Sequence, residues 1–148
     1  YPNVKFLLVG QDDIGSVDSV PISYLKSYED YSNFSWLGYR VDIKELYSIA
    51  YLAVFPSYYR EGGWPRGLAE PMAIGKPVIT TNSEHCSSAV VDGLIVPIKN
   101  SNPLANAINK IVNDKKLANI RWIKPRVKTV NMLNEETIMN QLINIILK

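Results

Sequence analysis

The sequence predicts an α/β fold, namely a doubly wound parallel sheet. Short apolar segments with strand character alternate with amphipathic helical segments along the 148 residues. The first apolar segment is continuously hydrophobic, as expected of a parallel strand that helices cover on both faces. Hydrophobic residues make up 47% of the chain, which is enough for one core. We therefore expect a single domain over residues 1–148.

The first expected strand is Lys5–Val9, which Gly10 closes. After a polar loop, residues 21–31 form a helix that a proline opens and that carries its apolar residues on one face. Phe34–Leu37 is then a short strand, and the turn of residues 38–40 ends it.

The next helix begins with a capping-box pattern formed by Asp42 and Glu45 and runs to Ala50. Leu52–Phe55 is another buried strand, and Pro56 marks its exit.

The most informative part of the sequence is residues 57–81, SYYREGGWPRGLAEPMAIGKPVITT, which predicts a loop, a helix and a strand in succession. Pro65 suits the first position of a helix, where its missing amide costs no hydrogen bond, and Gly75 suits a left-handed helix end. Pro77–Thr81 then forms a strand. A helix that starts behind a glycine-bearing loop, at the carboxyl end of a parallel strand, offers free amides and a positive dipole end to an anion.

The last part of the chain predicts a short helix over Ser87–Val91 and a strand over Leu94–Pro97. Asn102, followed by Pro103, is expected to cap an amphipathic helix. Beyond it, the sequence favours a helix over residues 117–127 that Pro125 breaks, and a final helix capped by Asn134 with an apolar face of Ile138, Leu142, Ile145 and Ile146.

Two carboxylates flank the expected anion site in the sequence. Glu61 lies in the loop, and Glu70 lies on the helix between apolar residues such as Leu68 and Met72. A carboxylate on so apolar a helix should be partly buried, which costs free energy unless its oxygens accept hydrogen bonds. Because ligand hydroxyls would supply those bonds, these residues predict a ligand that carries both phosphate and hydroxyl groups.

Other kinds of site fit the sequence less well. Asp12 and Asp13 resemble the acidic pair of phosphoryl-accepting receiver domains, but the third strand ends in residues 54–57 without an acceptor Asp. His85 and Cys86 are adjacent, whereas a metal site needs three or four ligands and a nucleophilic dyad needs facing side chains. The sequence contains neither a P-loop nor the dinucleotide fingerprint G-x-G-x-x-G.

Composition excludes several classes of partner. A net charge of +2 with scattered basic residues does not imply nucleic acid. Cys86 is the single cysteine, so no internal disulfide can form, which agrees with a reducing compartment. No apolar run reaches the roughly 18 residues that span a bilayer. The chain opens without an initiator Met and enters a strand almost at once, so we expect it to be a piece of a longer protein.

The order of motifs resembles a known family. LGY at residues 37–39, VFPSYYREG at 54–62, PRGLAEPMAIGKPVITT at 65–81 and AVVDGLIVP at 89–97 are similar to the carboxyl-terminal, donor-binding domain of family 4 retaining glycosyltransferases of the GT-B fold. The motif PRGLAEPMA resembles most the bacterial branch of this family, which builds surface polysaccharides. The resemblance covers nearly the whole chain and is weakest in the last helices.

The resemblance implies roles for particular residues. Glu61 matches the glutamate that contacts the transferred sugar, and Glu70 matches the one that binds the ribose hydroxyls. The amides of Arg66 and Gly67 would face the diphosphate, within a donor site that also includes the loop residues Gly62, Gly63 and Trp64. The turn Gly38, Tyr39 and Arg40 would pack on the base through its backbone.

The sequence departs from the family pattern in two places. The spacing from Glu61 to Glu70 is one residue longer than in the family, and the extra residue falls in the segment 62–64. The family's domain also begins with a strand and a basic pair that this sequence does not contain. That strand lies in the middle of the family's sheet, so we expect a shift of neighbours, another molecule or a separate segment to close the gap.

The resemblance implies an enzyme that moves a sugar from a UDP- or GDP-sugar to a glycan or lipid-linked acceptor, with no metal or other cofactor. We expect the activity to need an amino-terminal acceptor-binding domain, so that this chain alone is inactive. The resemblance implies a cytoplasmic location, and the full-length protein could also bind peripherally at the inner face of the membrane. The alternatives are another GT-B enzyme, such as a sugar-nucleotide epimerase, and a non-catalytic nucleotide-binding module.

Overall fold

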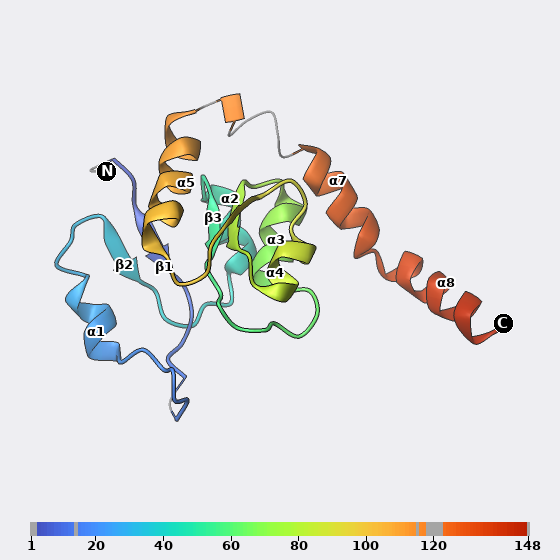
Figure 1. The fold of residues 1–148 in the computed structure, drawn as a ribbon, viewed down its shortest axis with the longest axis horizontal. Coiled ribbons are helices and arrows are strands. Elements are labelled where there is room, and N and C mark those ends of the chain that lie inside the picture. The colour runs from blue at the N-terminus through green and yellow to red at the C-terminus, as the bar shows by residue number, and fades with distance from the viewer. Residues whose placement is uncertain (1–2, 14, 115, 118–122, 148) are drawn as a thin grey trace. The chain divides into compact units, whose positions relative to one another are not determined.

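The computed structural model describes residues 3–13, 15–114, 116–117 and 123–147, with side chains described from residue 126 onward in the last of these ranges (Figure 1). The chain divides into two compact units, Tyr1–Ile43 and Lys44–Lys148. Each unit is treated by itself below, and the expectation of one domain over the whole chain stays a prediction.

The first unit is a small parallel α/β element. It contains β1 (Phe6–Leu8), α1 (Ile22–Ser27) and β2 (Phe34–Trp36). The two strands are parallel, with Phe6 opposite Phe34. Their carboxyl ends are tied together, because the indole of Trp36 donates to the Gly10 carbonyl at 2.9 Å and the Gly10 amide donates to the Gly38 carbonyl at 2.9 Å.

The second unit holds a three-stranded parallel sheet in the order β3-β4-β5. Its elements along the chain are α2 (Ile43–Ile49, whose first residue belongs to the first unit), β3 (Ala53–Phe55), α3 (Arg66–Ile74), β4 (Val78–Thr81), α4 (Glu84–Ala89), β5 (Leu94–Val96), α5 (Ser101–Asn113), α7 (Ile123–Met132) and α8 (Glu135–Ile146). All the pairings between these strands are parallel.

The central strand β4 is buried on both of its faces. Val78 packs with Leu68 and Met72 of α3 in one hydrophobic cluster, whereas Ile79 packs with Ile111 of α5 in another. Successive side chains of a strand point to opposite faces, so the two clusters lie on opposite sides of the sheet. The predicted doubly wound α/β class is therefore confirmed.

Each of the two described sheets has strands with an open edge. Among the described strands, β1 pairs only with β2, and β3 pairs only with β4. Each of these two strands therefore keeps one edge without a ladder partner in the described chain. What closes those edges stays a prediction.

Several helix boundaries differ from the sequence-based expectation. Pro65 is the residue before α3 rather than its first residue, because its ψ of 125° is still extended. The short helix over Ser87–Val91 was misplaced, since α4 starts at Glu84. Asn102 was the wrong cap for α5, because the Asn100 side chain accepts from the Asn102 amide and ends the loop two residues earlier.

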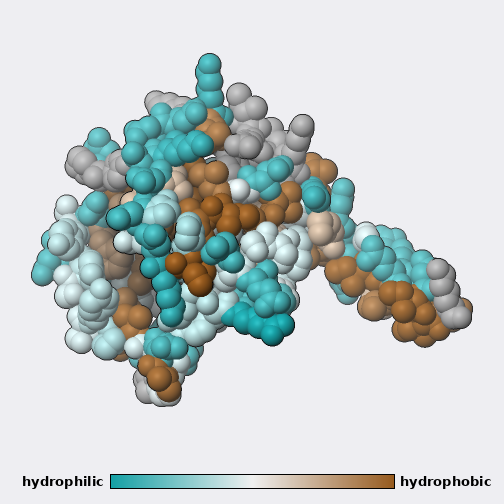
Figure 2. Space-filling view, in the orientation of Figure 1, coloured by the Kyte–Doolittle hydropathy of each residue, from teal (hydrophilic) through white to brown (hydrophobic). Residues whose placement is uncertain are grey.

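Towards the carboxyl terminus, part of the predicted helix 117–127 lies outside the described residues. Pro125 does not break α7 but stands in its first turn, where an amide has no partner to lose. Asn134 caps α8 as predicted, with its side chain accepting from the Thr137 amide at 3.0 Å. The apolar side of α8 is exposed, as Figure 2 shows, through residues that include Leu142, Ile145 and Ile146.

Candidate functional site

The candidate site is built on the amino terminus of α3, which follows the loop at the carboxyl end of β3. The Pro65 carbonyl accepts from the amides of Leu68 and Ala69, at 2.9 and 3.0 Å. Within the described chain, the amides of Arg66 and Gly67 have no acceptor. Unpaired amides at the positive end of a helix are suited to an anion, so this geometry agrees with the anion site that the sequence predicts, and the site itself stays a prediction.

Glu70 lies one turn into α3 and is partly buried, as predicted from its apolar neighbours. Its Oε1 accepts from the Arg66 guanidinium Nε at 3.0 Å, and the two side chains are 34% and 90% exposed respectively. A pair with so exposed a partner contributes about 0–1 kcal/mol to stability. The Glu70 carboxylate is therefore held in place weakly and stays open to a ligand.

Glu61 is fixed by the end of β3. Its Oε1 accepts a hydrogen bond from the Ser57 hydroxyl at 2.5 Å, and the same hydroxyl oxygen accepts from the Tyr59 amide at 3.2 Å. The Thr81 hydroxyl, at the end of β4, donates to the Ser57 carbonyl. The loop that carries Glu61 is thus tied to two neighbouring strands.

Gly67 is required for a reason that the sequence did not reveal. A Cβ at this position would lie 2.6 Å from the nearest atom of the Phe55 ring, closer than any real contact. Phe55 ends β3. The absence of a side chain therefore lets the first turn of α3 pack closely against the carboxyl end of β3. The amides of this turn thus lie near that end of the strand.

Tyr47 of α2 reaches this same turn. Its hydroxyl donates to the Gly67 carbonyl at 3.5 Å, and its ring packs against the core cluster that contains Leu68. Burial raises the pKa of the Tyr47 hydroxyl, and the negative charge of Glu70 raises it further. The Glu70 carboxylate therefore acts electrostatically on the Tyr47 hydroxyl.

The loop between Glu61 and α3 contains the predicted residues Gly62, Gly63 and Trp64. Gly63 has a φ of +85°, in the left-handed region that favours glycine. Gly62 would meet nothing within 4 Å if it carried a Cβ. Trp64 is half-buried and packs against the core cluster beneath α3.

The remaining predicted residues belong to the first unit. Gly38 has a φ of +62°, which confirms a turn there. The Arg40 guanidinium makes two hydrogen bonds to the Asp42 carboxylate, of 2.7 and 2.5 Å, and these bonds hold the pKa of Asp42 below its usual value. Tyr39 is 71% exposed.

The second unit therefore brings together seven of the ten predicted residues on one strand end and one helix start, namely Glu61, Gly62, Gly63, Trp64, Arg66, Gly67 and Glu70. Sequence reasoning missed the supporting residues Tyr47, Ser57 and Thr81. Ser57 and Thr81 are hydroxyl residues at strand ends, which is a usable signal, whereas Tyr47 lies on α2 and nothing in the sequence names its partner.

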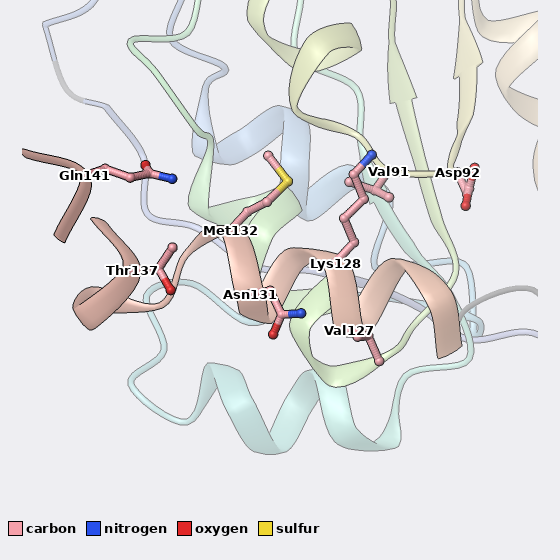
Figure 3. A pocket seen from close by; sticks show the side chains of 8 residues that line it. All are labelled: Val91, Asp92, Val127, Lys128, Asn131, Met132, Thr137 and Gln141. Atoms are coloured by element: carbon pink, nitrogen blue, oxygen red, sulfur yellow. The ribbon is translucent and has the colours of Figure 1, made fainter. Parts of the chain in front are cut away.

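A hollow of about 710 Å³ lies elsewhere in the second unit (Figure 3). It is lined by the segment before β5 and by α7 and α8, with residues Val91, Asp92, Val127, Lys128, Asn131, Met132, Thr137 and Gln141. Asp92 precedes the amino end of β5, whereas the candidate site lies at the carboxyl ends of the strands. None of the predicted site residues lines this hollow.

Other kinds of site find no support in the described part of the chain. Among those residues, no group of three or more His, Cys, Asp or Glu side chains could hold a metal ion. Cys86 is fully buried in the core of the second unit. Within the same described ranges, no helix has the length and apolar character needed to cross a membrane.

Parallel sheets flanked by helices, with a helix amino terminus that follows the carboxyl end of a strand, define a Rossmann-like α/β architecture. The sequence model of one family, described as glycosyl transferases group 1, matches residues 1–124. The chain therefore belongs to the glycosyl transferases group 1 family, and its fold is that of a GT-B carboxyl-terminal domain.

Individual relatives support this assignment. HepE of Anabaena, crystallised in complex with UDP, superposes with a TM-score of 0.84 at 26% identity, over 99% of this chain and 41% of HepE. Sucrose-phosphate synthase from Thermosynechococcus elongatus gives a TM-score of 0.77 at 29% identity, over 95% of this chain and 38% of the synthase.

A Campylobacter jejuni protein, N,N'-diacetylbacillosaminyl-diphospho-undecaprenol alpha-1,3-N-acetylgalactosaminyltransferase, is 32% identical over 116 residues. The alignment covers 76% of this chain but 29% of that transferase. The chain thus spans well under half the length of these relatives.

Proposed function

We propose that this chain is the donor-binding part of a family 4 glycosyltransferase, which moves a sugar from a nucleotide diphosphate sugar with retention at the anomeric carbon. One observation carries the proposal. The first turn of α3 presents the unpaired amides of Arg66 and Gly67, and the Glu70 carboxylate follows within the next turn. Amides at a helix start suit a diphosphate, and a carboxylate suits two ribose hydroxyls.

The proposed donor is a UDP-sugar. HepE, which shares this fold at 26% identity, was crystallised with UDP. The Campylobacter relative is named for transfer of N-acetylgalactosamine to a diphospho-undecaprenol-linked sugar. We place the reaction in bacterial surface-polysaccharide synthesis, on a glycan or lipid-linked acceptor, in the cytoplasm or at the inner face of the membrane. The acceptor is bound by an amino-terminal domain of the longer protein.

The proposed chemistry relies on positioning and on charge. The departing diphosphate gains negative charge as its bond to the anomeric carbon of the sugar breaks. The unpaired amides at the positive end of α3 would stabilise that charge. Glu61, held by Ser57, would fix a hydroxyl of the transferred sugar. No metal and no covalent nucleophile enter the proposal.

Calorimetric titration with UDP and with 2′-deoxy-UDP tests the proposal. Glu70→Gln keeps the side-chain shape but removes the charge that the ribose hydroxyls would meet. Because hydrogen bonds to a charged group contribute about 1.5–3 kcal/mol each, UDP affinity should fall by roughly tenfold or more. Glu45→Gln, an exposed glutamate on α2, is the matched control and should bind UDP like the wild type.

The wild type should also bind the deoxy analogue more weakly than UDP. Equal affinity of wild type and Glu70→Gln for UDP would remove Glu70 from the ribose site. A wild-type protein that binds neither UDP, GDP nor ADP would overturn the proposed function itself.

A further inference from the structure

Helix α3 contains a defect next to the candidate site. Pro71 lies inside the helix and has no amide hydrogen. In an uninterrupted α-helix, the residue at this position would donate to the carbonyl of Gly67, four residues earlier. The Gly67 carbonyl therefore lacks its usual donor, the amide four residues further along the helix, and the same residue carries one of the two unpaired amides.

A side chain from another helix meets that carbonyl. The Tyr47 hydroxyl of α2 donates to the Gly67 carbonyl at 3.5 Å, the long end of the hydrogen-bond range. The Tyr47 ring is packed against the core cluster, so the hydroxyl cannot leave this position freely. The Phe55 ring also lies close to this turn, because a Cβ at Gly67 would be 2.6 Å from its nearest atom.

From this geometry we propose that Tyr47 is a positioning residue of the nucleotide site, whose hydroxyl replaces the amide that Pro71 lacks and so fixes the first turn of α3. The inference rests on the proposed function, because the turn matters for activity only if its amides bind the diphosphate. The negative charge of Glu70, which helps to raise the pKa of Tyr47, agrees with a hydroxyl that lies near this part of α3.

Helix α2 also contacts the segment just after the carboxyl end of α3. This second contact provides a control for the experiment below. Lys76, just beyond the end of α3, donates from Nζ to the Ser48 carbonyl at 2.7 Å. This contact braces α3 without touching its first turn. Loss of it should lower stability without changing nucleotide affinity, whereas loss of the Tyr47 hydroxyl should change affinity.

A double-mutant cycle tests the proposal, because Pro71→Ala restores the missing amide. We expect Tyr47→Phe to weaken UDP binding by about threefold to tenfold, the effect of losing one hydrogen bond. In the Pro71→Ala background the new amide donates to the Gly67 carbonyl, so the same Tyr47→Phe change should alter UDP affinity by less than about 1.5-fold. Lys76→Met should leave UDP affinity unchanged.

The possible results separate this inference from the proposed function. A wild type without affinity for UDP, GDP or ADP overturns the proposed function and the role of Tyr47 together. If the wild type binds UDP but Tyr47→Phe binds it equally well, or weakens binding equally in both backgrounds, the role of Tyr47 alone is overturned. Should Pro71→Ala not fold, the contrast between Tyr47→Phe and Lys76→Met decides: equal effects of both on UDP affinity refute the positioning role.

Discussion

Replacing Gly67 by alanine should destabilise the protein, although alanine is the better helix former. The added Cβ would lie 2.6 and 2.7 Å from two atoms of the Phe55 ring, and overpacking of this kind costs about 1–3 kcal/mol. Helix propensity favours alanine over glycine by at most about 1 kcal/mol. The net expectation is therefore a loss of about 1–2 kcal/mol in the free energy of unfolding.

Gly62→Ala provides the matched control for this prediction. A Cβ at Gly62 would meet nothing within 4 Å, and its φ is not in the left-handed region. Surface changes of this kind usually alter stability by no more than about 0.5 kcal/mol. Urea denaturation followed by circular dichroism measures both variants, and the slope with denaturant should stay unchanged if only stability is affected.

A second variant tells whether the ring is the cause. Phe55→Leu shortens the side chain that faces Gly67, so Gly67→Ala should cost less in that background than in the wild type. The reasoning is refuted if Gly67→Ala is neutral or stabilising in the wild-type background. It is equally refuted if the cost is the same whether or not Phe55 is present.

Three further outcomes are expected. Asn100→Ala should cost about 0.5–2 kcal/mol of unfolding free energy, and Asn102→Ala much less, because the structure makes Asn100 the cap of α5; a larger loss at Asn102 would restore the original assignment. The pKa of the Tyr47 hydroxyl is raised, so the folded state keeps this proton to higher pH than the unfolded chain does. The neutral hydroxyl's contribution to stability is therefore complete below pH 10.0 and is lost as pH rises beyond it. Urea midpoints should fall less steeply above pH 10 in Tyr47→Phe than in Tyr51→Phe, and parallel curves would contradict this. Finally, UDP-sugar should change tryptophan fluorescence in the wild type and much less in Trp64→Phe; an equal change in both would remove Trp64 from the site.

The sequence by itself determined the local features of this protein. A left-handed φ of 82° at Gly75, the cap at Asn134 and a strand over Val78–Thr81 all follow from signals within a few residues. Such signals act through backbone dihedral angles, nearby amides and the alternation of side chains along a strand, all of which the sequence order fixes. The predicted α/β class rests on these signals.

Competition between equally good local signals was decided only by the fold. Asn100 and Asn102 are both suitable caps by residue type, and in the structure Asn100 caps α5. Pro125 could have broken a helix or stood in its first turn, and the start of α7 at Ile123 makes it a first-turn residue. Local residue preferences indicate where a helix could begin or end, but the packing of the folded chain decides which of these positions is the actual boundary.

The geometry of the candidate site was decided by tertiary structure. Glu61 and Glu70 could be named from their residue types and positions, and Arg66 and Gly67 from the family resemblance, but the residues that support them could not. Tyr47 reaches Gly67 across 20 residues of chain, and the Thr81 hydroxyl reaches the Ser57 carbonyl across 24. The physical reason is that contacts between distant residues depend on how whole helices and strands pack, and the sequence pattern of each element leaves that packing open.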